Sequence, residues 1–435
     1  MTPSDQQGAR SSGRNMSIVL VARGLMSAAR AVAGVVVALY LSAEGFSALQ
    51  LGLVFGVVAL SSALMSAVIG LASDAIGRKV FLIVIPALAS VAGVAFATSR
   101  ADIVLVVLAA LGSFGRGAGA GAGSVGPYQP AEAAFVAESV PEELRTRAFG
   151  RLSFASSLGA LAGGLLAGLA RPGHLTGAAA MVAYRPAFVA AAVLAGAAGL
   201  VAIGLKEVRT APRRPAGERR LVFPRRSWNV LWRFWITNSL NGLAIGMFGP
   251  FVSYWFHRRY GASPAQIGLL FAVINVATLA SALSAAAIAR RMGTLRAIVA
   301  VRLIQGALLV PMALSPWFWT AGAVYLVRMV VQRVGLPLRQ SFTQSVADPA
   351  ERASLAALSS LPAQGTQAGS QVLAGYLFAE VALAVPLLLA GILQMINALA
   401  YAGLFRGIFA AADGAKPVPE PAGIPDGTTA DAPRP

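Results

Sequence analysis

Long apolar stretches dominate this 435-residue chain and limit what it can fold into. Outside the tails there are about twelve of them, each near the ~20 residues that cross a bilayer as a helix. The chain is 57% hydrophobic and only 12% charged, whereas soluble proteins are about 25% charged. The sequence therefore predicts an all-α membrane protein with twelve transmembrane helices. The expected spans are 16–41, 49–69, 80–98, 102–126, 149–169, 187–205, 230–256, 265–288, 297–314, 318–337, 355–379 and 384–405.

Basic residues are distributed unevenly between the two sides of the membrane. If the N-terminus lies inside, inside loops and tails hold most of the 35 Lys and Arg residues. The few in outside loops are Arg100, Arg171, Arg185, Arg258 and Arg259. Because positively charged loops stay in the cytoplasm, we expect both termini inside. Only three of the 35 basic residues are lysine, and Ala, Gly and Pro are abundant, which suggests a GC-rich bacterial genome and so a bacterial cytoplasmic (inner) membrane. The net charge of +18 then serves topology and attraction to anionic lipids, and needs no nucleic-acid partner.

The two halves of the chain repeat each other. The segment GFSALQLGLVFGV at 45–57 aligns with GASPAQIGLLFAV at 261–273. A basic, proline-containing linker separates the halves, and such a repeat indicates duplicated bundles around a central site. The predicted divisions are a cytoplasmic N-tail (1–15), a six-helix bundle (16–205), the linker (206–229), a second six-helix bundle (230–405) and a disordered cytoplasmic tail (406–435).

The decapeptide GLASDAIGRK at 70–79 combines charge, glycine and fixed spacing. It resembles the loop between the second and third helices of major facilitator superfamily transporters, G-x-x-x-D-x-x-G-R-[RK]. The resemblance implies that fold, a monomer, and alternating access in which this loop latches the inside face. Glu138, at the end of the fourth helix, is a candidate partner for the arginine of the loop. The expected latch residues are Gly70, Asp74, Gly77, Arg78, Lys79 and Glu138.

Arginines within the spans are candidates for substrate contact, because charges in a membrane usually face a cavity. Arg23 and Arg30 share a face of the first span, whereas Arg233 and Arg302 are expected near inside ends. The resemblance aligns Arg116 with a fourth-helix arginine that is tied to proton coupling in many exporters, and Arg328 is its counterpart in the repeat. The predicted substrate-binding residues are Arg23, Arg30, Arg116, Asn241, Arg328 and Gln332.

Two glycine patterns bear on movement and direction of transport. The stretch GRGAGAGAGSVGPYQP at 115–130 predicts either a kinked or broken helix or close packing by small residues. The fifth span partly resembles the antiporter motif G-x8-G-x3-G-P-x2-G-G of drug exporters, but Gly164 replaces its proline. Small-residue packing is the alternative there too. The motif-like positions are Gly150, Gly159, Gly163, Gly164 and Gly168.

No pattern in the chain indicates an enzyme, a metal site or a cofactor. The chain has no cysteine, and His174 and His257 fall in expected outside loops. The predicted function is a secondary active transporter, a proton-coupled exporter of a small organic solute with an arginine-rich cavity. Glu132, the deepest acid, is the candidate for proton coupling, with Asp74 second. Import or exchange of an organic or phosphorylated anion, and a transport-inactive receptor or assembly protein, remain alternatives.

Overall fold

In this computed structural model, the described residues are 3–115, 126–140, 142–173, 175, 177–206, 225–346, 348, 351, 355 and 358–413. Every regular element among them is a helix, as predicted. Arg116, His174, most of the linker and the tail from residue 414 lie outside these ranges. Within them, eight helices are long and apolar enough to cross a membrane on their own.

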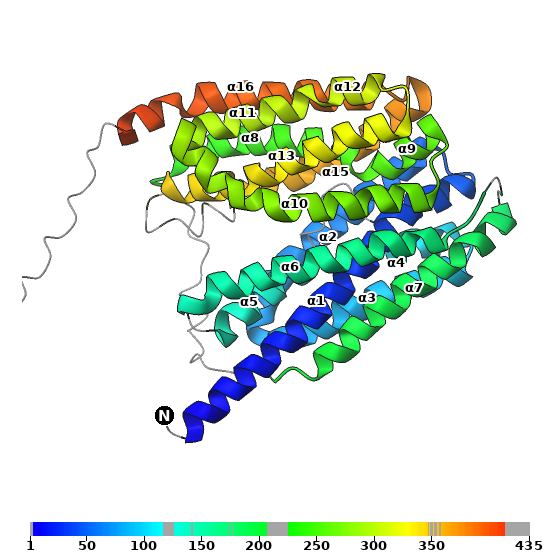
Figure 1. Ribbon diagram of the computed structural model, residues 1–435, viewed down its shortest axis with the longest axis horizontal. Coiled ribbons are helices and arrows are strands. Elements are labelled where there is room, and N and C mark those ends of the chain that lie inside the picture. The colour runs from blue at the N-terminus through cyan, green and yellow to red at the C-terminus, as the bar shows by residue number, and fades with distance from the viewer. Residues whose placement is uncertain are drawn as a thin grey trace, which may run out of the picture.

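The first half of the chain supplies the lower bundle in Figure 1, in blue to green. Its helices are α1 (Pro3–Ala43), α2 (Ala48–Ile76), α3 (Arg78–Thr98), α4 (Asp102–Gly112), α5 (Tyr128–Ser139), α6 (Glu142–Leu166), the 3-10 turn η2 (Ala167–Leu169) and α7 (Gly177–Ile203). α1 packs along α6 and α7, and α3 packs along α7.

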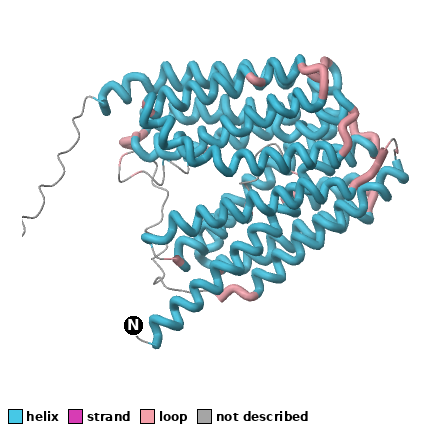
Figure 2. The backbone as a smooth tube through the Cα atoms, viewed as in Figure 1, coloured by secondary structure: helices cyan, strands magenta, loops and turns pink. Residues whose placement is uncertain are grey.

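The second half supplies the upper bundle, in green to orange-red. Its helices are α8 (Trp228–Phe248), the 3-10 turn η3 (Gly249–Phe251), α9 (Val252–Tyr260), α10 (Pro264–Met292), α11 (Thr294–Ala307), α12 (Leu309–Leu314), α13 (Phe318–Ser345), α15 (Leu361–Glu380) and α16 (Val385–Asp413). Here α8 packs along α15 and α16, and α11 packs along α16. The short loops gather at the two ends of the helices (Figure 2).

Each expected span corresponds to a helix or to a pair of consecutive helices. The fourth span begins as α4, and α5 follows beyond its expected end; the seventh is divided into α8 and α9, and the ninth into α11 and α12. α8 and α15 are absent from the eight strongly apolar spans, and each carries buried polar side chains such as Asn238 and Gln371. The outermost helices run further than expected, since α1 begins at Pro3 and α16 continues to Asp413.

Identical helix caps make the internal repeat visible in the structure. At the start of α2, the Gln50 backbone N–H donates to Ser47 Oγ at 3.2 Å, and the Ser47 N–H donates to Gln50 Oε1 at 2.8 Å. At the start of α10, Ser263 and Gln266 form the same pair of bonds at the same two distances. Each capping box fixes where its helix begins. The repeat seen in the sequence thus specifies the same helix start in both bundles.

Candidate functional site

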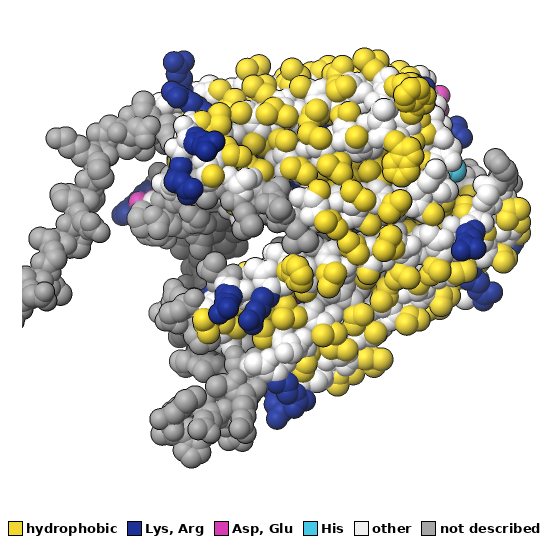
Figure 3. All heavy atoms as spheres, viewed as in Figure 1, with side chains coloured by type: hydrophobic (Ala, Val, Ile, Leu, Met, Phe, Trp, Pro, Cys, Tyr) yellow, Lys and Arg dark blue, Asp and Glu magenta, His cyan; other side chains and the backbone are white. Residues whose placement is uncertain are grey.

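The two bundles meet at one end of the molecule and separate at the other. α1 begins and α16 ends at the same end of the molecule (Figure 1), which we call the open end. A cleft separates the bundles there in Figure 3. We call the opposite end the closed end. A membrane protein of this shape exposes its interior to one side of the membrane only.

Rings and backbone join the bundles at the closed end. The Phe55 ring of α2 lies 5.3 Å from the Phe251 ring, centre to centre, and Phe251 lies 5.1 Å from Phe378. The Ser253 hydroxyl donates to the Gly34 carbonyl at 3.3 Å, which joins α9 to α1. These contacts exclude water from this end, so the closed end is an apolar plug.

Glycines let two helix pairs cross the boundary between the bundles at short distance. α6 meets α10 where Gly164 faces Gly268, and a Cβ added to Gly164 would lie 2.7 Å from the Gly268 carbonyl oxygen. α2 meets α15 where Gly52 faces Gly375, and a Cβ on Gly52 would lie 3.1 Å from the Gly375 Cα. Residues with side chains could not approach this closely. Gly164, where the antiporter pattern has proline, is therefore at the boundary between the bundles.

The other positions of the antiporter-like motif lie along α6, or in η2 for Gly168, and have different neighbours. A Cβ on Gly159 would lie 2.0 Å from the Gly24 carbonyl oxygen, and one on Gly163 would lie 2.2 Å from the Ala28 carbonyl oxygen, so both pack on α1. Gly168 faces Ala265, and Gly150 has open space beside it. Close helix packing explains every one of these positions except Gly150.

A buried ion pair joins α1 to α5. Arg23 Nη1 forms an ion pair with Glu132 Oε2, and both side chains are buried. The second carboxylate oxygen, Glu132 Oε1, is buried without a hydrogen-bond partner among the described residues. Breaking such a pair leaves a charge that is costly to bury. The expected substrate-binding Arg23 and the expected coupling residue Glu132 therefore form one unit.

The fourth span is interrupted where the glycines begin. α4 ends at Gly112, Ser113 has φ 51° and Gly115 has φ 81°. A Cβ on Gly112 would lie 2.9 Å from the Leu88 carbonyl oxygen, so the helix is both broken and closely packed. Past the interruption, the Arg30 guanidinium lies against Gly126, where an added Cβ would be 2.8 Å from Arg30 Nη1. Arg116 lies outside the described residues.

The expected latch brings together α3 and α5. Arg78 Nη1 lies 2.5 Å from Glu138 Oε2 and donates to the Ala134 carbonyl at 2.5 Å. Gly77, with φ 105°, forms the turn between α2 and α3, and Gly70 has open space beside it. The pairing of Arg78 with Glu138 is therefore present. The side chain of Asp74 is not among those described.

A polar cluster lies inside the second bundle, and Arg302 is at its centre. The sequence placed Arg302 near the inside end of its span, and in the structure its side chain is buried, with a relative exposure of 6%. Its Nη1 donates to Asn241 Oδ1 at 2.9 Å, and its guanidinium lies 4.7 Å from the Tyr401 ring centre. Gln394 Nε2 donates to Gln305 Oε1 at 3.2 Å.

The two expected substrate residues of α13 lie apart. Gln332 lines a cavity beside Arg302 and Asn241. Arg328, one turn earlier, is buried beside Tyr325, and its Nε has no hydrogen-bond partner among the described residues. The cluster around Arg302 therefore includes Gln332 but is not centred on Arg328. Gln305 and Gln394 were not expected, because single amides on apolar helices carry no distinctive sequence signal.

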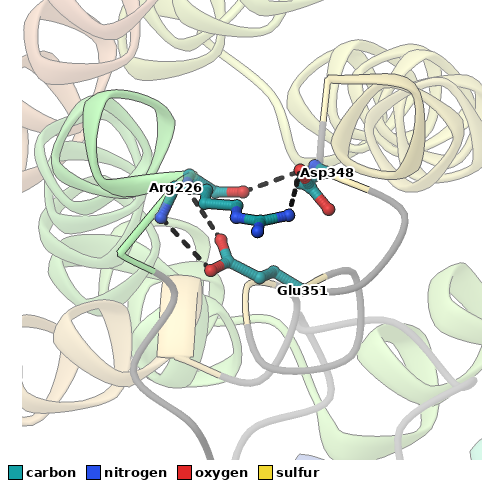
Figure 4. A network of polar contacts seen from close by, with 4 residues as sticks. Arg226, Asp348 and Glu351 are labelled. Carbon is teal, nitrogen blue, oxygen red and sulfur yellow. Dashed lines mark hydrogen bonds and ion pairs between the residues drawn. The ribbon is translucent and has the colours of Figure 1, made fainter.

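A third polar network holds the open end of the second bundle (Figure 4). Glu351 accepts from the backbone N–H groups of Arg226 and Ser227, at 3.2 and 2.8 Å, just before α8 begins. Arg226 Nη1 lies 4.0 Å from Asp348 Oδ2. Desolvation raises the pKa of Glu351, but the hydrogen bonds from Ser227 and Arg226 together outweigh it and hold that pKa below its usual value. The negative charge also suits the N-terminus of α8.

The profile of the Major Facilitator Superfamily matches residues 19–365. The chain belongs to the major facilitator superfamily. It is therefore a secondary transporter that spans the membrane many times, and not an enzyme. The expected fold of two related six-helix bundles is confirmed.

Relatives and solved structures agree with this family. The chain is 28% identical to the multidrug resistance protein MdtG of Dickeya zeae, over 64% of this chain and 66% of that protein. It is 26% identical to MdtG of Escherichia fergusonii, over 73% and 76%. In fold it is similar to the POT family transporter PepTSo (TM-score 0.72, 13% identity, 92% and 98% covered). A bacterial homologue of the lysosomal transporter Spinster, inward-facing and unoccupied, gives TM-score 0.68 at 15% identity, with 92% and 98% covered.

Proposed function

We propose that this superfamily member is a proton-coupled exporter of a small organic solute in the inner membrane of a bacterium, working as a monomer. The open end would face the cytoplasm, with both termini there, because the basic residues concentrate in those loops. Export is favoured by the similarity to the two MdtG proteins, whose names describe multidrug resistance. The glycine spacing of α6 is consistent with that direction.

The observation that carries proton coupling is the buried pair of Arg23 and Glu132. A carboxylate with one unpaired buried oxygen can take up a proton there, and the neutral acid no longer holds the guanidinium by charge. The contact between α1 and α5 is then weaker, so α1 can move relative to α5. If Glu132 takes up a proton in one conformation and gives it up in the other, proton flow is tied to alternating access.

The test is efflux from proteoliposomes under an imposed pH gradient, with a panel of lipophilic and anionic solutes. The wild type should move at least one solute faster with the gradient than without it. Glu132→Gln should remove that dependence, whereas Asp102→Asn, which neutralises an exposed acid at the start of α4, should keep it and serves as the control. Gradient-driven transport that persists in Glu132→Gln would exclude Glu132 as the coupling residue.

The latch can be tested with the same assay. Arg78→Gln removes the ion pair to Glu138 and the bond to the Ala134 carbonyl. Transport should fall severalfold while the melting temperature changes little, because Glu138 is exposed to water and surface pairs stabilise by about 0–1 kcal/mol. Arg147→Gln changes an exposed arginine of α6 and should transport normally. Equal transport by both variants would argue against the latch.

Import or exchange of an organic anion is the second candidate. It is favoured by the arginines of the interior, since Arg30 is half-buried and Arg302 and Arg328 are buried. An exchanger would move labelled anion in response to unlabelled anion on the other side, without a pH gradient. That result, together with no effect of Glu132→Gln, would select exchange over proton-coupled export.

A further inference from the structure

The cavity inside the second bundle is lined by side chains suited to an anion. It lies between α8, α11, α13 and α16 and has a cavity volume of about 80 Å³. The polar residues that line it are Asn241, Arg302, Gln305, Gln332, Arg339 and Gln394. One buried water needs about 10–15 Å³ of such volume. The cavity therefore admits a ligand of several non-hydrogen atoms.

The charged side chains that line this cavity are all positive. Arg302 and Arg339 both line it, and its lining within the described part of the chain includes no carboxylate. Arg302 is held by neutral groups, the Asn241 amide oxygen and the Tyr401 ring. Two like charges in a bilayer interior repel and are costly to bury. An anion between them would relieve both costs at once.

Amides beside the arginines add hydrogen-bonding capacity that the protein does not use. Gln332 Oε1 and Gln394 Oε1 are buried without a partner among the described residues. An unsatisfied buried acceptor costs about 1–3 kcal/mol. A ligand hydroxyl could donate to these oxygens, while the guanidinium of Arg302 donates two parallel bonds to an oxyanion.

We propose that this cavity binds a small organic acid, with its oxyanion on Arg302 and Arg339 and its hydroxyl groups on the glutamine amides. The site is contained in the second bundle and is separate from the Arg23–Glu132 pair of the first. It requires neither export nor proton coupling, so its failure and the failure of the proposed function can be told apart.

The experiment is thermal unfolding of the purified full-length protein with L-malate or phosphate, each compared with sodium chloride at equal ionic strength. A ligand that binds only the folded form raises the melting temperature with its concentration. Malate has two carboxylates and a hydroxyl group. It should raise the melting temperature of the wild type until binding saturates. Phosphate acting equally well would show that the oxyanion alone is recognised.

Three substitutions test whether malate stabilises the protein by binding in this cavity. Arg302→Gln should raise the apparent Kd for malate at least tenfold, and Arg302→Lys should recover part of the loss, because it keeps charge without the paired donors. Arg296→Gln, on the exposed face of the same helix, is the matched control and should bind as the wild type does. If Arg302→Gln does not fold, Arg339→Gln at the half-buried rim decides in its place.

Two outcomes would overturn the proposal. One is no stabilisation by either anion beyond that of chloride. The other is the same apparent Kd in the cavity variants as in Arg296→Gln, since the anion would then bind elsewhere. Glu132→Gln should keep malate binding, which separates this site from the coupling pair.

Discussion

At the scale of single residues, the ion pair of Arg23 with Glu132 differs in kind from that of Arg78 with Glu138. Both members of the first pair are buried, whereas Glu138 in the second is exposed. A buried pair that loses one member leaves an uncompensated charge, which costs about 3–5 kcal/mol. A pair at the surface loses much less, because water replaces the missing partner.

Arg23→Gln should therefore lower the free energy of unfolding by about 3–5 kcal/mol, and Glu132→Gln by a comparable amount. The double substitution should lose less than the sum of the two, because it leaves no lone charge. Thermal unfolding of the four proteins in one detergent measures this coupling. Strictly additive losses would mean that the two side chains do not stabilise each other.

The sequence predicted the surroundings of some single residues but not of others. The pairing of Arg78 with Glu138 was expected, because the loop motif and the end of the fourth helix are both recognisable. The burial of Arg302 was not, because an arginine eight positions after Thr294 could equally extend to the inside surface. Only the packing of α16 and α8 around it decides between the two positions.

At the scale of helices, two glycines of α6 differ only in what surrounds them. Gly164 faces Gly268 across the boundary between the bundles, and Gly150 faces open space. Gly164→Ala should lower stability, because its Cβ would lie 2.7 Å from the Gly268 carbonyl oxygen, and overpacking costs about 1–3 kcal/mol. Gly150→Ala should leave stability equal or higher, since Ala favours a helix by about 1 kcal/mol. Melting temperatures in the opposite order would contradict this packing.

The start of α8 should respond to pH through Glu351. Its pKa is lowered in the folded protein, so its carboxylate stabilises this loop at neutral pH. That contribution is complete above the unfolded value, about 4.3, and is lost as pH falls through the lower folded value. Glu351→Gln should lower the melting temperature at pH 7, and the difference from wild type should shrink below about pH 4. A difference that does not vary with pH would exclude this role for the charge.

Helix positions were predicted more accurately than helix boundaries and breaks. Each of the twelve expected spans contains at least part of a described helix, because long apolar segments have few alternatives in a membrane. The division of the ninth span at Leu308 had no sequence signal, and the interruption after Gly112 was one of two readings of the glycine stretch. Local glycine content permits a break, but neighbouring helices decide whether it forms.

At the scale of the whole molecule, the two bundles should rock about the glycine contacts near the closed end. The chain has no cysteine, so introduced cysteines can be spin-labelled without background. Labels at Arg147 and Arg290, exposed positions at the open ends of α6 and α10, report the width of the cleft. Their distance distribution should have two components, and Glu132→Gln should change the ratio. A single component that is unaffected by Glu132→Gln would contradict this movement.

The closed end is joined by rings and backbone, and this has a consequence for temperature. Opening that end would expose the faces of Phe55, Phe251 and Phe378 to water. Exposure of apolar surface to water raises the heat capacity, so the enthalpy of opening itself changes with temperature. The ratio of the two conformations should then follow a curved van't Hoff plot. Cooling should favour opening of this end, because the hydrophobic contribution that keeps it closed weakens in the cold.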